Sequence, residues 1–409
     1  MRKILFIFFL LTSVNIYSGD IIIDENMIAE KAMQNNPELI AAEKMVKSYE
    51  AKSHKQFFFE NPMIGIEYMG INDSSINLNT SMEQNIAISQ KIPFPLKWMW
   101  KIGAGIEESN YYKYMYEMKK FEILSASKIA YYELFRTIKF IEITREILSL
   151  LKQLADIAFV KYNQGMINQF ELSKMDIEKD ILENDLIVLK REKEIKIQNL
   201  RKIISDQEFL KENFSVKEIN IPEIRYTFEE LKEIALKKSP FLKAKKSLRE
   251  ASFNMRNMAI SDYLPDFNVQ LKKQISPAIN EYSIMFEAEI PLWFLNNQQA
   301  DISEKWEMAE SKQKEYENAI NEIIYKVKEH YEIIKSNNDS IDLYKNKIIP
   351  RLNSVVESAM TSYKNKKIEF MTLLDSERML LDAKKQYYML VVEYLIHFRM
   401  LEELTGSLE

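Results

Sequence analysis

Long segments without Gly or Pro constrain this chain most, because those two residues interrupt helices. The sequence has 409 residues but only 7 Gly and 10 Pro. Neither residue occurs in the segments 106–164, 166–221, 292–349 and 351–405. A helix of nearly 60 residues would be about 87 Å long, far beyond the diameter of a compact domain. The sequence therefore predicts long helices that pack along one another.

Apolar residues within these segments follow the alternating spacing of three and four residues that is typical of coiled coils. The positions are Ile147, Leu151, Leu154 and Ala158 on an earlier helix, and Leu373, Leu380, Ala383, Tyr387, Leu390, Tyr394, His397, Leu401 and Leu404 on the last one. The other faces are dense in Lys and Glu, as solvated faces are. We expect a mainly α-helical fold built from long antiparallel coiled-coil helices.

Two short segments between Asp266 and Ile290 break this helical pattern, because polar and apolar residues alternate along them. Alternation with period two predicts strands that have one wet face and one apolar face. Each segment is near the 9–11 residues that a tilted strand needs to cross a bilayer. The pattern favours a membrane hairpin with its polar face toward a water-filled lumen. A solvated hairpin packed on helices is the alternative.

The chain also repeats itself. Asn36-Pro37 recurs 203 residues later as Ser239-Pro240, and Lys91-Ile92-Pro93 recurs 198 residues later as Glu289-Ile290-Pro291. The spacing between matching motifs changes by only a few residues over half the chain, which indicates an internal duplication. Its unit is helix, strand, strand, long helix, turn, helix. The predicted boundaries are a first repeat at 20–205 with a hairpin at 62–92, a linker at 206–228 that lies across the outside of the helices, and a second repeat at 229–409 with a hairpin at 265–291.

Residues 1–19 have the pattern of a secretory signal peptide: Met1-Arg2-Lys3, an apolar run, and small residues near Ser18 and Gly19. No later apolar run reaches the length of a transmembrane helix, so a membrane crossing would require a closed barrel. Four strands cannot close a barrel, since the smallest membrane barrels need about eight. Closure therefore requires several protomers.

Each half has a turn between its last two helices. The first is Tyr162-Asn163-Gln164-Gly165, where Gly165 can take the positive φ that follows a helix end. The second is Tyr363-Lys364-Asn365-Lys366, where we expect Asn365 to be the left-handed residue.

Several classes of function have no support in the sequence. The net charge of −5 argues against a nucleic-acid partner. There is no Cys, and the three histidines are far apart in sequence and form no ligand motif; His397, on a heptad core position, is expected to hydrogen-bond within the helices. The 21 Met are scattered and suit packing. No phosphate loop, nucleophile motif or metal-ligand spacing is present, so we expect neither an enzyme nor a cofactor.

With these features together, the chain resembles the TolC family of outer-membrane efflux channels. The resemblance covers the chain after the signal peptide. Its most specific segments are Ala29–Ala42 with Asn36-Pro37, the turn at 162–165, and the stretch from Ile349-Pro350 through Phe370–Arg378 to Leu401–Gly406. The closing segment is most similar to the branch that works with cation-exporting pumps of the resistance-nodulation-division type.

This resemblance implies a homotrimer in the outer membrane, in contact with its lipid. The twelve strands of the trimer would form one membrane β-barrel, continued by a periplasmic α-barrel of twelve helices. A periplasmic adaptor (membrane fusion protein) and an inner-membrane pump of the resistance-nodulation-division type would dock at the helix turns. The channel would carry small solutes out of the cell, and the branch that it resembles points to heavy-metal cations among them.

The resemblance also implies roles for single residues. In related channels, acidic residues and a tyrosine near the turns constrict the entrance, and Glu171, Tyr363 and Asp375 stand at matching positions. Tyr162, Gly165 and Lys366 would belong to the docking tips. This chain departs from the best-known relative at Thr372, Ile368 and Lys366, which replace an acid, an arginine and a glycine.

Charged residues on the strands would face the lumen. They are Glu67, Glu83, Lys91, Lys272, Glu281, Glu287 and Glu289. Carboxylates repeated around a narrow axis attract cations and repel anions. For each single acid, an ordinary solvated carboxylate is the simpler interpretation.

Two rival functions within the channel class are drug efflux and type I protein secretion. A rival from another class is a periplasmic coiled-coil scaffold or adaptor without a pore, which the four alternating strands disfavour.

Overall fold

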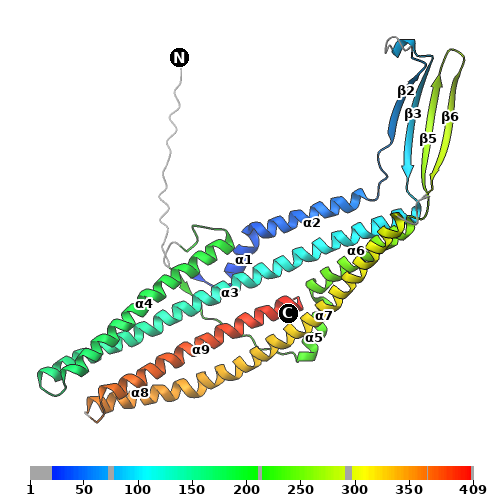
Figure 1. The fold of residues 1–409 in the computed structure, drawn as a ribbon. Helices are drawn as coiled ribbons and strands as arrows, with labels where there is room; N and C mark the ends of the chain where they lie inside the picture. The colour runs from blue at the N-terminus through cyan, green and yellow to red at the C-terminus, as the bar shows by residue number, and fades with distance from the viewer. Residues whose placement is uncertain (1–20, 72–77, 211–213, 291–296, 366, 407–409) are drawn as a thin grey trace, which may run out of the picture.

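The chain forms a long body of helices with a small sheet projecting from one end (Figure 1). The computed structural model describes residues 21–71, 78–210, 214–290, 297–365 and 367–406. The predicted signal peptide and Lys366 lie outside these ranges. Within them, no helix combines the length and the apolar character that a bilayer crossing requires.

The first half of the chain contains the longest helix of the described residues. Its elements are β1 (Ile21–Ile23), α1 (Glu25–Asn35), α2 (Pro37–Lys55), β2 (Met63–Met69), a 3₁₀ turn (Leu78–Thr80), β3 (Glu83–Ile92), α3 (Pro95–Asn163) and α4 (Gln169–Ile204). With 69 residues, α3 is about 100 Å long. It runs from the sheet to the opposite end of the body (Figure 1).

The second half follows the same order. Its elements are β4 (Phe214–Val216), α5 (Phe228–Lys238), α6 (Pro240–Ser261), β5 (Asp266–Ile275), β6 (Asn280–Glu289), α7 (Asn297–Leu343), a π turn (Tyr344–Ile348), α8 (Ile349–Lys364) and α9 (Phe370–Thr405). The π turn stands directly before Pro350, which has no N–H to donate and whose ring collides with the carbonyl of Asn346 in a regular helix. The wider turn accommodates the proline without ending the helix.

Each half begins with two short helices where the sequence predicts one. Asn36 and Ser239 have extended ψ angles of 119° and 121°, because a proline follows each of them. Both prolines occupy the first position of the next helix, where no N–H is needed.

A small parallel sheet of β1 and β4 is absent from the sequence-based expectations. It joins the start of the described chain to the predicted linker. The Tyr131 hydroxyl, from α3, lies 3.2 Å from the Ile23 carbonyl and 2.9 Å from the Lys217 carbonyl, at the carboxyl ends of the two strands. The linker is therefore attached to the helices, and its last residue, Phe228, is already the first residue of α5.

Apolar side chains form two clusters along the body. The first, in its middle, contains Tyr131, Leu200, Leu231 and Val392, so that α3, α4, α5 and α9 share it. The second, toward the turns, contains Leu154, Met175, Leu182 and Leu373 from α3, α4 and α9. Both halves contribute to each cluster, which fixes the halves side by side.

Arg399 ties the two halves together within the first cluster. Its side chain is 12% exposed and lies 3.2 Å from Glu25 on α1 and 2.6 Å from Glu402 on α9. Its Nε donates to the Tyr132 hydroxyl on α3 at 3.0 Å, and that hydroxyl donates to Glu25. Every charge in this group has a partner.

We expect Arg399→Met to lower the free energy of unfolding by about 3 kcal/mol, because it leaves Glu25 and Glu402 without their cation in a largely buried place. Differential scanning calorimetry of the detergent-solubilised protein measures the change. The exposed Arg351→Met is the matched control, for which we expect a change within about 0.5 kcal/mol. Equal effects of the two substitutions would contradict the structural role of Arg399.

Candidate functional site

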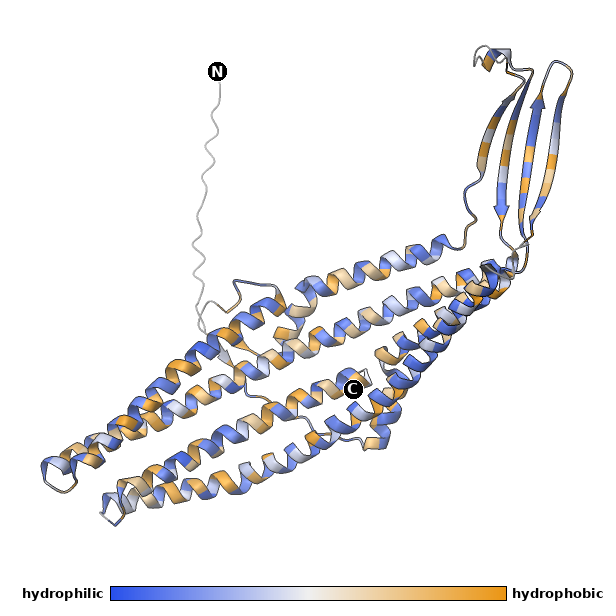
Figure 2. Cartoon of the chain, viewed as in Figure 1, coloured by the Kyte–Doolittle hydropathy of each residue, from blue (hydrophilic) through white to orange (hydrophobic). Residues whose placement is uncertain are grey.

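The four long strands form one antiparallel sheet in the order β2-β3-β5-β6. The two predicted hairpins lie side by side, because β3 pairs with β5 over nine residue pairs from Gln84–Ile275 to Ile92–Phe267. The pairing places residues in rows across the sheet, such as Glu67, Asn85, Gln274 and Glu281. Figure 2 shows the alternating hydropathy along these strands.

One face of this sheet carries all the strand residues that were predicted to line a lumen. The register puts Glu67, Glu83, Lys91, Lys272, Glu281, Glu287 and Glu289 in rows of that face. Polar partners hold several of them: Asn85 donates to Glu67 at 3.2 Å, and Asn268 donates to Glu287 at 2.7 Å. Lys91 lies 2.9 Å from Glu289 and 3.7 Å from Asp266. This face suits contact with water.

The opposite face is apolar and open. Ile64, Tyr282 and Phe286 on it are 72%, 70% and 78% exposed. The register also places Gln84, Gln90 and Lys273 on this face. Lys273 is its one charged residue in the described strands, and its ammonium lies 5.4 Å from the centre of the Tyr282 ring. An exposed apolar surface of this extent requires another apolar environment.

Both outer strands of the sheet have an open edge. In the described sheet, β2 pairs only with β3, and β6 pairs only with β5. Such edges present backbone N–H and C=O groups that bind a further strand. Both edges of the described sheet are therefore available to pair with a further strand.

Two helix turns lie at the other end of the body, far from the sheet (Figure 1). In the α3–α4 turn, Gly165 has φ +68°, as predicted, and the Met166 N–H donates to the Lys161 carbonyl at 2.9 Å. Tyr162 is 37% exposed beside it. Asn168 begins α4, because its side chain accepts a hydrogen bond from the Glu171 N–H at 2.9 Å.

The prediction of a left-handed Asn365 in the α8–α9 turn is wrong. Asn365 has φ −89° and ψ 12°, close to the −87° and 2° of Gln164 in the first turn. The Lys367 N–H donates to the Ser362 carbonyl at 2.8 Å, just as Met166 bonds to Lys161, 201 residues earlier. This register makes Asn365 the counterpart of Gln164. The counterpart of Gly165 is Lys366, which lies outside the described residues.

Tyr363, one of the predicted entrance residues, is buried at the tip of the helical body. The Lys161 ammonium, from the first half, lies 4.1 Å from the centre of its ring, and Phe370 packs edge-on at 6.1 Å. Burial and then the charge of Glu171 raise the pKa of Tyr363, so Glu171 and Tyr363 lie close together. The tyrosine holds the two turns against each other.

Asp375 is exposed on α9 and belongs to a group of charges that the sequence analysis missed. Arg378 donates from Nε to Glu178 at 3.0 Å and also from Nη2 to the other oxygen of that carboxylate. The pKa of Arg378 is raised mainly by its hydrogen bond to Glu178. The charge of Asp375 raises it further. This bridge joins α4 to α9 above the turns, across residues 200 positions apart.

The structure also brings together two of the three histidines. Nδ1 of His330 on α7 lies 3.0 Å from Nδ1 of His397 on α9, so one ring donates to the other. Burial lowers the pKa of both rings. Glu329 and Lys326 on α7 and Glu393 on α9 are the charged groups that act on the pair. Two protonated rings would place two N–H groups against each other.

We expect the stability of the protein to fall between about pH 7 and pH 5 because of this pair. The folded state holds both pKa values below the ordinary 6.5, so the unfolded chain takes up protons first as the pH falls. His330→Gln with His397→Gln should flatten the decrease in a series of calorimetric melting temperatures. The exposed His54→Gln is the control that should keep the wild-type profile. A double variant with that same profile would contradict the prediction.

Within the described ranges, no group of three or more His, Asp or Glu side chains is arranged to hold a metal ion. The arrangement is a two-faced sheet at one end of the body and two charged helix tips at the other.

No protein-family model matches the sequence, and a search of curated proteins gives no match. Solved structures do match. One of them is CusC, whose crystal structures concern folding and transmembrane channel formation. Its sequence is 14% identical to this chain, and the match covers 96% of each chain with a TM-score of 0.82. The outer membrane channel CmeC of Campylobacter jejuni is 15% identical with a TM-score of 0.77, over 93% of this chain and 85% of its own. The open-state outer membrane channel MtrE of Neisseria gonorrhoeae is 10% identical with a TM-score of 0.78, over 94% and 89%.

These likenesses confirm the mainly helical fold with few strands that the TolC resemblance predicts. The chain has the fold of the TolC-type outer-membrane channels.

Proposed function

We propose that this chain is one subunit of an outer-membrane efflux channel, a passive exit duct with no enzymatic activity of its own. The two-faced sheet carries this proposal. Its apolar face suits lipid and its charged face suits a water-filled lumen, as in membrane barrels. The channel fold supports the same function, and the helical body would extend into the periplasm.

The open edges of the sheet support a closed assembly of several subunits. Four strands are too few for a membrane barrel, which needs about eight or more. Three copies would supply twelve strands, joined between β6 of one subunit and β2 of the next. Closure would leave no edge in the bilayer, where an unpaired backbone group is costly.

Charges on the polar face favour the passage of cations. Six carboxylates, including Asp266, stand there against two lysines, Lys91 and Lys272. Repeated by symmetry around a lumen, this excess of negative charge attracts cations and repels anions. Small cations, heavy metals among them, therefore suit the duct better than acidic drugs or secreted proteins do.

The helix tips are the proposed docking site for a periplasmic adaptor and an inner-membrane pump of the resistance-nodulation-division type. Tyr162 and Gly165 are exposed there, and no atom lies within 4 Å of the place where a Cβ of Gly165 would stand. Glu171 and Asp375 are proposed to form rings of negative charge near this entrance. The tips would open when the partners bind.

Single-channel recording in planar bilayers tests the proposal on the purified, detergent-solubilised protein, whose mass in solution should be that of three chains. We expect a cation-selective pore. Glu171→Gln with Asp375→Asn should reduce the permeability ratio of cation to anion, because the entrance loses two carboxylates per subunit. The exposed Glu229→Gln, on α5 between the two ends, is the matched control and should leave selectivity unchanged.

Other outcomes separate the parts of the proposal. If the pore forms and both entrance substitutions leave its selectivity unchanged, the result would support the channel and contradict the roles of Glu171 and Asp375 at its entrance. Protein that fractionates with soluble periplasmic components and never conducts would support the scaffold alternative.

A further inference from the structure

The duplication gives the chain two equivalent joints, each between the start of one helix and the end of another. In the first joint, α2 begins near the end of α4. Asn36 closes it with both ends of its amide: Oδ1 accepts from the Glu38 N–H at 2.9 Å, and Nδ2 donates to the Ile203 carbonyl at 2.9 Å.

The second joint lies where α6 begins near the end of α9. Ser239 is the counterpart of Asn36, and α9 ends at left-handed Gly406 just as α4 ends at left-handed Ser205, 201 residues earlier. Leu404 is therefore the counterpart of Ile203. The shorter Ser239 side chain makes no capping hydrogen bond; it is 1% exposed, and its Oγ has no partner among the described residues.

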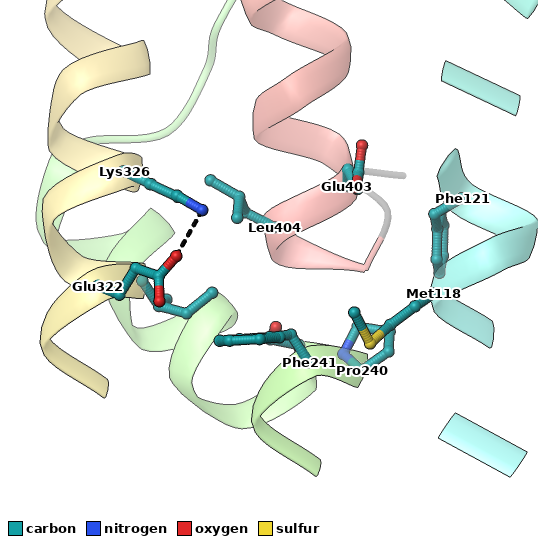
Figure 3. A pocket seen from close by; sticks show the side chains of 10 residues that line it. Met118, Phe121, Pro240, Phe241, Glu322, Lys326, Glu403 and Leu404 are labelled. Carbon is teal, nitrogen blue, oxygen red and sulfur yellow. Dashed lines mark ion pairs between the residues drawn. The ribbon is translucent and has the colours of Figure 1, made fainter. Parts of the chain in front are cut away.

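A cavity of about 220 Å³ occupies this second joint. Figure 3 shows its walls: Met118 and Phe121 from α3, Pro240 and Phe241 from α6, Leu404 and Glu403 from α9, and Glu322 and Lys326 from α7. Ser239 also lines it. A mostly apolar space with a few polar groups is the usual form of a small-molecule site.

The charges around the cavity are unequal. Lys326 forms an ion pair with Glu322, whose carboxylate lies 2.6 Å from the Lys326 ammonium. Glu403 has no Lys or Arg nitrogen within 4.0 Å in the described part of the chain, and the Ser125 side chain lies close enough to lower its pKa. Burial, followed by the charge of Glu122, raises the pKa of Glu403, and the charge of Lys326 opposes this increase only in part. A cation bound in the cavity would neutralise the charge of this carboxylate.

We propose that the second joint is a binding site for a small hydrophobic amine. Its ammonium pairs with Glu403 and can donate to the unpartnered Ser239 hydroxyl, while its apolar body lies against Phe121, Phe241 and Met118. Aromatic faces and the methionine sulfur both suit such a ligand. The site is formed within one subunit and away from the strands, so it does not depend on the channel proposal.

Isothermal titration calorimetry of the detergent-solubilised full-length protein with 3-phenylpropylamine tests the site. The neutral 3-phenylpropan-1-ol and the anionic 3-phenylpropionate have the same apolar body and show how much of any signal comes from the micelle. We expect the amine to bind and the other two to bind at least about tenfold more weakly, as loss of a charged hydrogen bond implies. Absent amine binding, or equal binding of amine and alcohol, would overturn the proposal.

Two variants locate the binding. Glu403→Gln should weaken the amine about tenfold, while the exposed Glu310→Gln on α7 should leave its affinity unchanged. Ser239→Asn transfers the residue of the first joint: its amide should reach the Leu404 carbonyl, fill the cavity, remove amine binding and raise the melting temperature. A folded Ser239→Asn protein, checked by circular dichroism, that binds the amine with wild-type affinity would refute the site even if Glu403→Gln failed to fold.

Discussion

The unpaired backbone groups at the two edges of the four-stranded sheet are the constraint on which the rest of this structure depends. β2 and β6 each present a row of backbone groups with no partner in the subunit, and one face of the same sheet exposes residues such as Phe286 to whatever surrounds it. Neither surface is tolerable for a protein alone in water. In the proposed channel, neighbouring copies would pair with the open edges and lipid would cover the apolar face. The helical body would then have to follow the curvature of the closed sheet.

The two halves share one order of elements but differ in detail. The first tip turn has Gly165 and the second has Lys366 at the same place in the repeat. The first joint is closed by Asn36 and the second is left open by Ser239. The helix of the second half also needs a π turn before Pro350, while α3 runs unbroken. In the proposed trimer each difference would occur three times, so the two halves of one chain could perform separate tasks.

Periodic features were predictable from the sequence, and features that depend on helix rotation were not. Alternation along 266–290 identified the strands, and Gly165 marked a turn whose positive φ the structure shows. The β1–β4 sheet was missed because three residues are too few to show a period. Asn365 was misassigned because asparagine adopts the left-handed region more readily than lysine does, whereas its place in the turn gives it the angles of Gln164. The Glu178–Arg378 and His330–His397 contacts join positions 200 and 67 residues apart, and only the rotation of each helix about its axis decides that they meet.

Unbroken length has a mechanical consequence. α3 carries no proline after Pro95 and no wide turn, so it behaves as one stiff rod of about 100 Å between the strands and the tip. Tilting such a rod by one degree about its strand end would displace the other end by about 1.7 Å, given that length. In the proposed channel, a small change of angle at the rim of the β-barrel would thus become a movement of atomic size where Tyr162 and Glu171 lie. The aperture at the tips would then change while every hydrogen bond inside the helix is kept.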